Sequence, residues 1–140
     1  MTRLLMLAVL FAACSDKDAG IPDANAMDAA MPDAMPREVI NAVKPLQVGE
    51  LVEGAMTGGM GDLAVITLSA PIAKMGWNIH GHANGGTQII FEEHDKAAVT
   101  YTFAPATHAE WYLLVRNEGT ANMDVTVKVE LFGGMTWAWL

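Results

Sequence analysis

Val125-Thr126-Val127-Lys128-Val129-Glu130-Leu131 carries the clearest structural signal in this chain of 140 residues. Its odd positions are apolar and its even positions are polar, a period of two that is typical of a half-buried β-strand. The turn-forming sequence Asn-Glu-Gly-Thr at 117–120 precedes it. Residues 111–115, before that turn, are apolar on both faces and predict a central strand of the same sheet system.

The same pattern extends outward from this stretch toward the N-terminus. Further strands are predicted at residues 51–56, 62–68, 77–82, 87–91 and 99–103. The Ala-Asn-Gly-Gly sequence at 83–86 predicts a hairpin between two of them, whereas residues 38–43 are compatible with one short helical turn that ends before Pro45. We therefore predict an all-β antiparallel β-sandwich of about seven to eight strands over residues 37–140.

The inward-facing side chains of these strands define the expected core. It comprises Leu63, Val65, Trp77, Ile79, Tyr101, Phe103, Trp111, Leu113, Val125, Val127 and Val129. Trp137 and Trp139 share one face of a last strand, and burial of this pair would close the sandwich. If exposed, the two indoles would instead form a patch for a protein partner or a glycan.

Residues 1–13, MTRLLMLAVLFAA, differ in composition from everything that follows. Arg3 is the only charge, and an unbroken apolar run of ten residues extends from position 4 to position 13. A basic start followed by a short apolar run is typical of a secretory signal peptide. A helix needs about 20 apolar residues to span a bilayer, so the run is too short for a permanent transmembrane segment.

Phe11-Ala12-Ala13-Cys14 resembles the lipobox of bacterial lipoproteins. The resemblance implies that Cys14 becomes the lipidated first residue of the mature chain, which holds it on a membrane through its acyl chains. In that family, the residue after the cysteine guides sorting, and Ser15 favours the outer membrane over the inner one. The expected location is thus the cell envelope, and the alternative is a plain secretory signal with an incidental thiol at Cys14.

Residues 14–36, which begin with Cys14, are predicted to form a disordered tether. Aspartate, alanine, methionine and proline dominate the segment, and it contains no aromatic residue. Such a composition buries too little apolar area to offset the entropy of folding. Met27, Met31 and Met35 have the spacing of soft metal ligands on one side of a helix, but Pro32 and Pro36 oppose a helix there.

Composition excludes several classes of function. Sixteen acidic and eight basic residues give a net charge of −8, which repels the phosphates of nucleic acid. The single cysteine excludes a disulfide framework. Ser69 is the only serine of the domain and lacks a nucleophile-elbow sequence. Adjacent residues Glu92 and Glu93 face opposite sides of a strand and cannot act as a catalytic pair, so we expect no catalytic activity.

The four histidines, all within residues 80–108, are the best candidates for chemistry. In His80-Gly81-His82 the two imidazoles share the strand face opposite Trp77, at a spacing that can chelate Cu²⁺ or Zn²⁺. Glu92 and His108 are possible additional ligands. Two alternatives remain open: a polar strand face that meets solvent, and a pH-responsive partner surface.

The acidic run at residues 92–95, which includes Glu92, Glu93 and His94, is a separate feature. His94 lies about 14–16 Å along the hairpin from the His80–His82 pair and is not expected to join it. The run could bind Ca²⁺ loosely, but it is more typical of a solvated turn.

Residues 77–131 also resemble bacterial sandwich domains of the GOLD-like and pre-peptidase C-terminal types. The resemblance rests on the residues at 77–80, on Thr-Phe-Ala-Pro at 102–105, on the stretch from Trp111 to Asn117, and on residues 125–127. It implies an accessory module rather than a catalyst. We therefore predict a lipid-anchored extracytoplasmic binding or interaction module, with an envelope protein or a glycan as partner. The alternative is a periplasmic copper- or zinc-binding protein that uses His80 and His82.

Overall fold

The computed structural model describes residues 35–83 and 85–140. The predicted signal peptide, Cys14 and nearly all of the predicted tether lie outside the described residues. No helix long and apolar enough to cross a membrane occurs in the described part of the chain.

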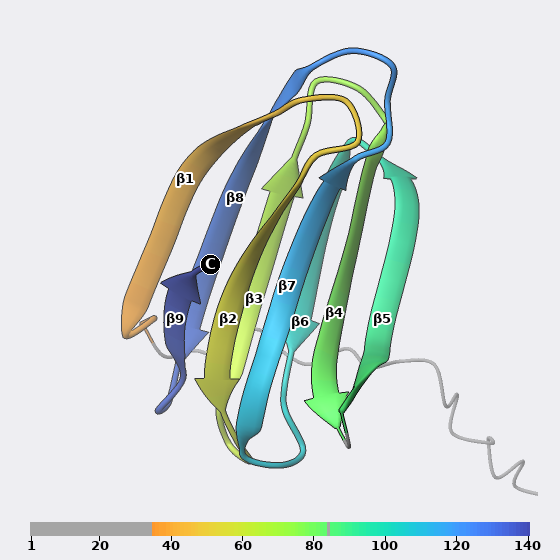
Figure 1. The fold of residues 1–140 in the computed structure, drawn as a ribbon. Helices are drawn as coiled ribbons and strands as arrows, with labels where there is room; N and C mark the ends of the chain where they lie inside the picture. Colours follow the sequence, from red (N-terminus) through yellow and green to blue (C-terminus); the bar gives the residue numbers. More distant parts are fainter. Residues whose placement is uncertain (1–34, 84) are drawn as a thin grey trace, which may run out of the picture.

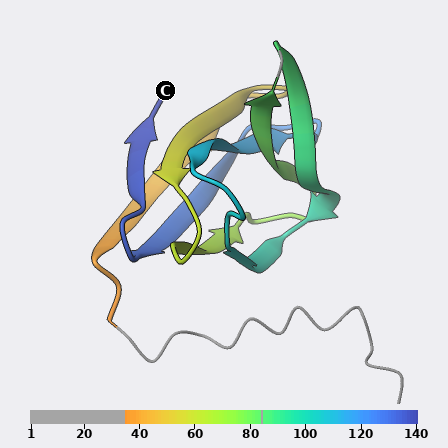
Figure 2. The same ribbon diagram turned by 90° about the horizontal axis from the view of Figure 1, so that it is seen from below.

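Nine β-strands make up the described fold (Figure 1). They are β1 (Glu38–Leu46), β2 (Leu51–Gly58), β3 (Leu63–Ser69), β4 (Met75–Ala83), β5 (Gly86–Lys96), β6 (Ala98–Phe103), β7 (Ala109–Asn117), β8 (Met123–Phe132) and β9 (Thr136–Trp139). A four-stranded sheet has the order β1-β8-β3-β6, and a five-stranded sheet has the order β5-β4-β7-β2-β9. The two sheets lie face to face (Figure 2), so the all-β sandwich predicted from the sequence is confirmed.

The stretch with the clearest alternation forms β8, which lies between β1 and β3. Its odd-numbered side chains are buried in the core, and its even-numbered side chains face outward on the four-stranded sheet. β7, predicted as a central strand, occupies the middle of the five-stranded sheet. Alternation and apolar content therefore identified one inner strand of each sheet correctly.

The prediction of a helical turn at residues 38–43 is wrong. This segment belongs to β1, which pairs with β8 along its whole length, with Ile40 opposite Val129 and Ala42 opposite Val127. An isolated helical turn is costly to nucleate, whereas pairing with β8 supplies backbone partners and apolar burial. Pro45 is compatible with β1 because β1 is an edge strand.

The predicted face of β3 is also wrong. Ala64, Ile66 and Leu68 point into the core, whereas Leu63 and Val65 lie on the outer face of the four-stranded sheet. Four consecutive apolar residues begin β3, so the sequence offers no alternation from which the inner face can be read. Val65 is only 2% exposed even on the outer face.

The acidic run at 92–95 forms part of β5 and is not a solvated turn. Glu92 lies opposite Asn78, and Glu93 lies opposite Trp77 on β4. The indole Nε1–H of Trp77 donates to Glu93 Oε2 at 3.2 Å. Pairing with β4 thus gives charged residues a strand conformation that their composition alone does not predict.

Aromatic side chains close the two open sides of the sandwich. On one side, Trp77, Phe91 and Tyr101 pack together with ring centroids 4.6–5.4 Å apart. On the other, Lys44 Nζ lies 3.7 Å from the ring centroid of Trp139. Trp137 and Trp139 are half-buried and pack against the core, which is the first of the two alternatives that the sequence left open. All described strands and the whole core lie between Glu38 and Trp139, so the sandwich is held by contacts within residues 35–140.

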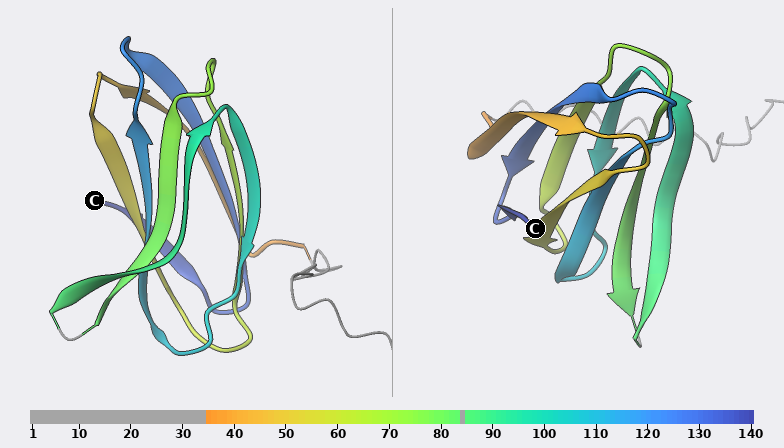
Figure 3. Two further views of the ribbon diagram at one scale, coloured as in Figure 1. Left: turned by 90° about the vertical axis from the view of Figure 1, so that its right-hand side faces the viewer. Right: turned by 45° about the horizontal axis from the view of Figure 1, so that its top comes forward.

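The hairpin of β4 and β5 extends beyond the body of the sandwich (Figure 3, left). Its predicted position is confirmed, because β4 ends at Ala83 and β5 begins at Gly86. Gly85 has a φ of 77°, a left-handed conformation that glycine adopts at little cost. Consecutive residues 87–90 are all exposed, so both faces of this end of the hairpin are in contact with solvent.

Candidate functional site

The His80-Gly81-His82 sequence lies on β4, on the outer face of the five-stranded sheet. His80 is opposite Tyr112 on β7 and opposite Ile89 on β5. Trp77 and Ile79 point into the core on the other face. The predicted orientation of the two histidines, away from the core, is therefore confirmed.

This face does not simply expose its polar residues to solvent, because His80 and Asn78 are buried. Asn78 is 9% exposed and His80 is 5% exposed, whereas His82 is exposed. His80 Nδ1 lies 2.8 Å from Asn78 Oδ1, and His80 Nε2 lies 3.3 Å from Glu53 Oε1 on β2. Both ring nitrogens of His80 thus face partners within the chain.

Three aromatic rings form what we call the His–Tyr cluster, which consists of His80, His82 and Tyr112. The Tyr112 ring stacks on His80 with centroids 5.2 Å apart and an interplanar angle of 17°. His82 meets Tyr112 edge-on at 4.8 Å and His80 edge-on at 5.3 Å. The Tyr112 hydroxyl donates to the Glu110 carboxylate. The cluster therefore presents aromatic surface held in place by carboxylates on two sides.

Burial sets the protonation of the central histidine. Loss of solvent lowers the pKa of His80, an effect that the Glu53 carboxylate opposes and nearby His82 reinforces. In its neutral form His80 can donate from only one ring nitrogen, either to Asn78 Oδ1 or to Glu53 Oε1, while its ring stacks on Tyr112.

The structure does not bring the additional candidate ligands to the His80–His82 pair. Glu92 Oε2 lies 3.7 Å from His94 Nε2. His108 precedes β7 and packs on Gly59 in the β2–β3 connection. Among residues 35–83 and 85–140, no group of three or more His, Cys, Asp or Glu side chains is placed to hold a metal ion. The metal site at His80 and His82 stays a prediction.

Glu53 and Tyr112 are the site residues that sequence reasoning missed. Glu53 is a polar residue within a predicted strand, and Tyr112 lies in a stretch that we assigned to a central strand. Their approach to His80 depends on the strand order β4-β7-β2. That order joins segments far apart in the chain, and no local pattern in the sequence indicates it.

Four carboxylates on this face lack a cationic lysine or arginine partner within the described residues. They belong to Glu53, Glu92, Glu110 and Glu118. Their ionic or hydrogen-bonding neighbours are histidines and Tyr112. The salt bridges of lysine residues instead involve Asp95, Glu93 and Glu130. The outer face of the five-stranded sheet therefore carries four carboxylates without a salt bridge to a lysine or arginine of the described residues, although Lys74 interacts with Glu118 at longer range.

Next to the His–Tyr cluster, Arg116 and His94 line a small hollow of about 130 Å³. His94 Nδ1 lies 2.7 Å from Glu118 Oε1, and the hydrogen bond and charge of Glu118 raise the pKa of His94. Arg116 lies on the same face, with no carboxylate within ion-pair distance among the described residues. The hollow therefore contains both basic and acidic side chains and lies at the border of the acidic face.

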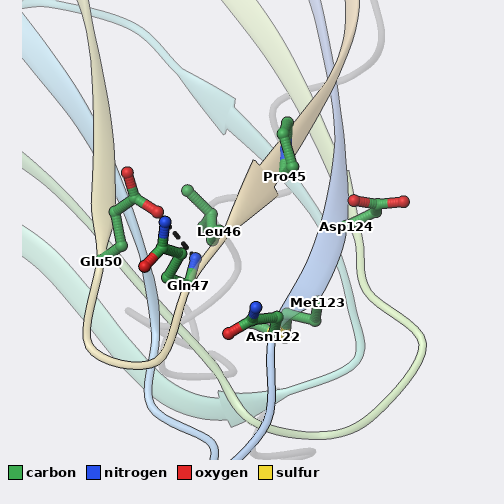
Figure 4. A pocket seen from close by; sticks show the side chains of 7 residues that line it. All are labelled: Pro45, Leu46, Gln47, Glu50, Asn122, Met123 and Asp124. Carbon is green, nitrogen blue, oxygen red and sulfur yellow. Dashed lines mark hydrogen bonds between the residues drawn. The ribbon is translucent and has the colours of Figure 1, made fainter.

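A larger hollow of about 540 Å³ lies at the end of the sandwich where the β1–β2 turn meets the start of β8. Figure 4 shows Gln47 bonded through its backbone N–H to the Glu50 carboxylate, at 2.7 Å. The carboxylates of Glu50 and Asp124 lie on opposite sides and point apart (Figure 4). None of the site residues predicted from the sequence lines this hollow.

Comparisons with known proteins bear on the fold alone. No protein-family model matches the chain, and no curated protein matches its sequence. The resemblance to GOLD-like and pre-peptidase C-terminal domains therefore stays a prediction. Among solved structures, the Yersinia pseudotuberculosis-derived mitogen (YPM) is similar, with a TM-score of 0.51, 13% identity, and coverage of 69% of this chain and 86% of that chain.

A second similar structure is Aeromonas hydrophila PliG, a periplasmic lysozyme inhibitor of g-type lysozyme. Its TM-score is 0.49 and its identity is 8%, with coverage of 73% of this chain and 91% of that chain. The likeness to the mitogen agrees with a β-rich fold but does not assign a function, since one fold hosts many functions.

Proposed function

We propose that this protein is a lipid-anchored extracytoplasmic binding module without catalytic activity, and that it binds a protein partner through the outer face of its five-stranded sheet. The observation that carries the proposal is the His–Tyr cluster between carboxylates that no lysine or arginine of the described chain neutralises. Carboxylates left without an internal counter-ion are complementary to a basic partner surface.

The composition of this face resembles that of protein interfaces. Tyrosine is among the residues that contribute most to binding, especially when its ring is held rigidly by neighbours. Tyr112 is held by stacking on His80 and by its hydrogen bond to Glu110. The net charge of −8 also favours diffusional encounter with a cationic partner.

Binding is tested with the soluble domain of residues 35–140 and a synthetic hexa-arginine peptide as probe. We expect NMR shift changes on titration to centre on Glu53, Glu110 and Tyr112, and to weaken as salt is added. The double variant Glu53→Gln with Glu110→Gln should weaken binding more than Glu38→Gln with Asp124→Asn, which removes two charges from the four-stranded sheet. Equal effects of the two pairs would contradict the proposed surface.

A glycan partner is tested by titration with a neutral oligosaccharide in place of the peptide. A neutral oligosaccharide carries no cationic group, so its binding would depend on Tyr112→Ala but not on Glu53→Gln or on salt. That result would support the same binding face but would refute a basic protein as its partner.

The lipid anchor is the second part of the proposal and rests on Cys14 and the sequence before it. The 22 tether residues that follow Cys14 reach roughly 70 Å in extended form, which would hold the binding face clear of the membrane. Incorporation of radiolabelled palmitate in a bacterial host should occur in the wild type. It should be abolished by Cys14→Ser, and labelling of that variant would refute lipidation at Cys14.

Metal binding is the second candidate function, favoured by the 5.3 Å between the His80 and His82 ring centroids. Titration of the soluble domain with Cu²⁺ and with Zn²⁺ tests it. Sub-micromolar binding that is lost in the His80→Ala, His82→Ala double variant would support it. Binding only at millimolar metal would refute it.

A further inference from the structure

The end of β5 next to the hairpin turn is an unprotected sheet edge. We call residues 86–90 the distal β5 segment. β5 pairs only with β4 and forms one edge of the five-stranded sheet. Ile89 is 48% exposed and Ile90 is 43% exposed, and the segment contains no charged residue. Such an edge presents free backbone N–H and C=O groups to any strand that approaches.

Two of the other sheet edges of the described fold, β1 and β9, carry features that oppose strand pairing. β1 contains Glu38, Lys44 and Pro45, and β9 has only four residues. The remainder of β5 is charged from Glu92 to Lys96, and Asp95 has a positive φ of 53°. Charge, proline and short length are the usual protections of an edge strand. The distal β5 segment has none of these.

The register of the hairpin shows which backbone groups are free. Ala83 and Gly86 form the pair that closes the hairpin, so this pair exchanges hydrogen bonds with each other. Because such pairs alternate with non-hydrogen-bonded ones, Thr87 (opposite His82) and Ile89 (opposite His80) direct their backbone N–H and C=O groups outward. Four backbone groups are therefore available on the free edge.

We propose that the distal β5 segment pairs antiparallel with the same segment of a second copy of this chain, about a two-fold axis at Gln88. In this register Thr87 lies opposite Ile89 of the second copy, and the outward groups of both residues form reciprocal hydrogen bonds. A contact of one patch with itself is the geometry of a two-fold symmetric dimer. The two five-stranded sheets then form one continuous sheet.

The distribution of charged residues along β5 favours pairing with a second copy in this register. With the axis at Gln88, residues 86–90 pair with each other, and the charged residues from Glu92 onward extend past the end of the opposing strand. A symmetric register centred on Glu92 or Glu93 would place like carboxylates opposite each other, which is unfavourable. The uncharged segment therefore matches itself in an alignment that avoids this repulsion.

Disulfide trapping tests this register directly. Cys14 is the only cysteine of the chain, so a Gln88→Cys variant of residues 35–140 carries a single thiol. The two Cβ atoms at position 88 would lie about 4.5–5.5 Å apart across the axis, within reach of a disulfide. The matched control is Asn41→Cys, an exposed position on the edge strand β1.

We expect Gln88→Cys to form disulfide-linked dimers under mild oxidation at least about tenfold faster than Asn41→Cys at the same protein concentration. Sedimentation equilibrium of the unmodified domain should show a monomer–dimer equilibrium, which Ile89→Lys weakens about tenfold, or by about 1.4 kcal/mol. Circular dichroism of each variant verifies the fold. Equal cross-linking rates of the two cysteine variants, or a monomer at all concentrations, would overturn the proposal.

Discussion

At the scale of single residues, Asn117 links the β1–β2 connection to the β7–β8 connection at one end of the sandwich. Its side chain is fully buried. Its amide Nδ2 donates to the carbonyl oxygens of Leu46 at 3.1 Å and Ala121 at 2.9 Å, and its Oδ1 accepts from the Gly119 N–H at 2.8 Å. A single side chain thus satisfies backbone groups that burial would otherwise leave without partners.

We predict that Asn117→Ala lowers the free energy of unfolding by about 3 kcal/mol, because buried backbone groups lose their hydrogen-bond partners. Urea unfolding of residues 35–140, followed by tryptophan fluorescence, measures the change. The control Asn41→Ala removes an exposed amide from β1 and should change stability by less than about 0.5 kcal/mol. Equal losses in the two variants would show that the three hydrogen bonds contribute little.

Two histidines on the same face are predicted to titrate in opposite directions. The Glu118 carboxylate raises the pKa of His94, whereas burial lowers the pKa of His80. The stability that His94 contributes is present below its unfolded pKa of about 6.5 and is lost as pH rises through its folded pKa. For His80 the sign is opposite: its contribution is present above about pH 6.5 and is lost as pH falls toward its folded pKa.

NMR titration of the imidazole resonances checks this prediction. The midpoint for His94 should lie above about 6.5 and the midpoint for His80 below it. Glu118→Gln should return the His94 midpoint toward the reference value and leave His80 unchanged. Coincident midpoints would contradict the described environments.

At the scale of elements, β9 depends on a residue without a side chain. Gly54 on β2 lies opposite Trp139, and a Cβ at position 54 would overlap the Trp137 ring. We predict that Gly54→Ala displaces β9 from β2 and destabilises the domain by about 1–3 kcal/mol. Urea unfolding and the emission maximum of the tryptophans measure this, with Thr57→Ala on the same strand as the control. An unchanged emission maximum would mean that the Trp137 ring adapts without moving.

Local patterns predicted some elements of this fold and not others, for physical reasons. β8 alternates strictly, and the turn sequence at 83–86 predicted the hairpin that places Ile89 opposite His80. The face of β3 could not be predicted, since its consecutive apolar residues suit either orientation. β1 was missed because its pairing with β8 joins opposite ends of the domain, which are distant in sequence.

Likewise, the sequence predicted only some features of the candidate site. The shared orientation of His80 and His82 follows from the two-residue period of a strand and was predicted. Contact of His80 with Glu53 requires β7 to lie between β4 and β2. Burial of His80 and Asn78 on an outer sheet face depends on neighbouring side chains such as Tyr112, whose positions only the assembled sheet defines.

At the scale of the whole molecule, the two open sides of the sandwich are closed by different interactions. Apolar aromatic packing among Trp77, Phe91 and Tyr101 links the sheets on one side. On the other side, the described link is the contact of Lys44 with Trp139, where a cation lies over an aromatic face. Burial of a large ring contributes more than a partly exposed cation–π pair, so the aromatic side should hold the sheets together more strongly.

We predict that Phe91→Ala lowers the free energy of unfolding by about 3 kcal/mol, since it removes a large ring from the packed side. Lys44→Met keeps the length of the side chain but removes its charge, and should cost no more than about 1 kcal/mol. Guanidinium unfolding of residues 35–140 measures both, and an unchanged denaturant slope verifies that the sandwich still unfolds as one unit. A larger loss from Lys44→Met than from Phe91→Ala would mean that closure at β1 and β9, the strands that end the two sheets, governs the stability of the whole domain.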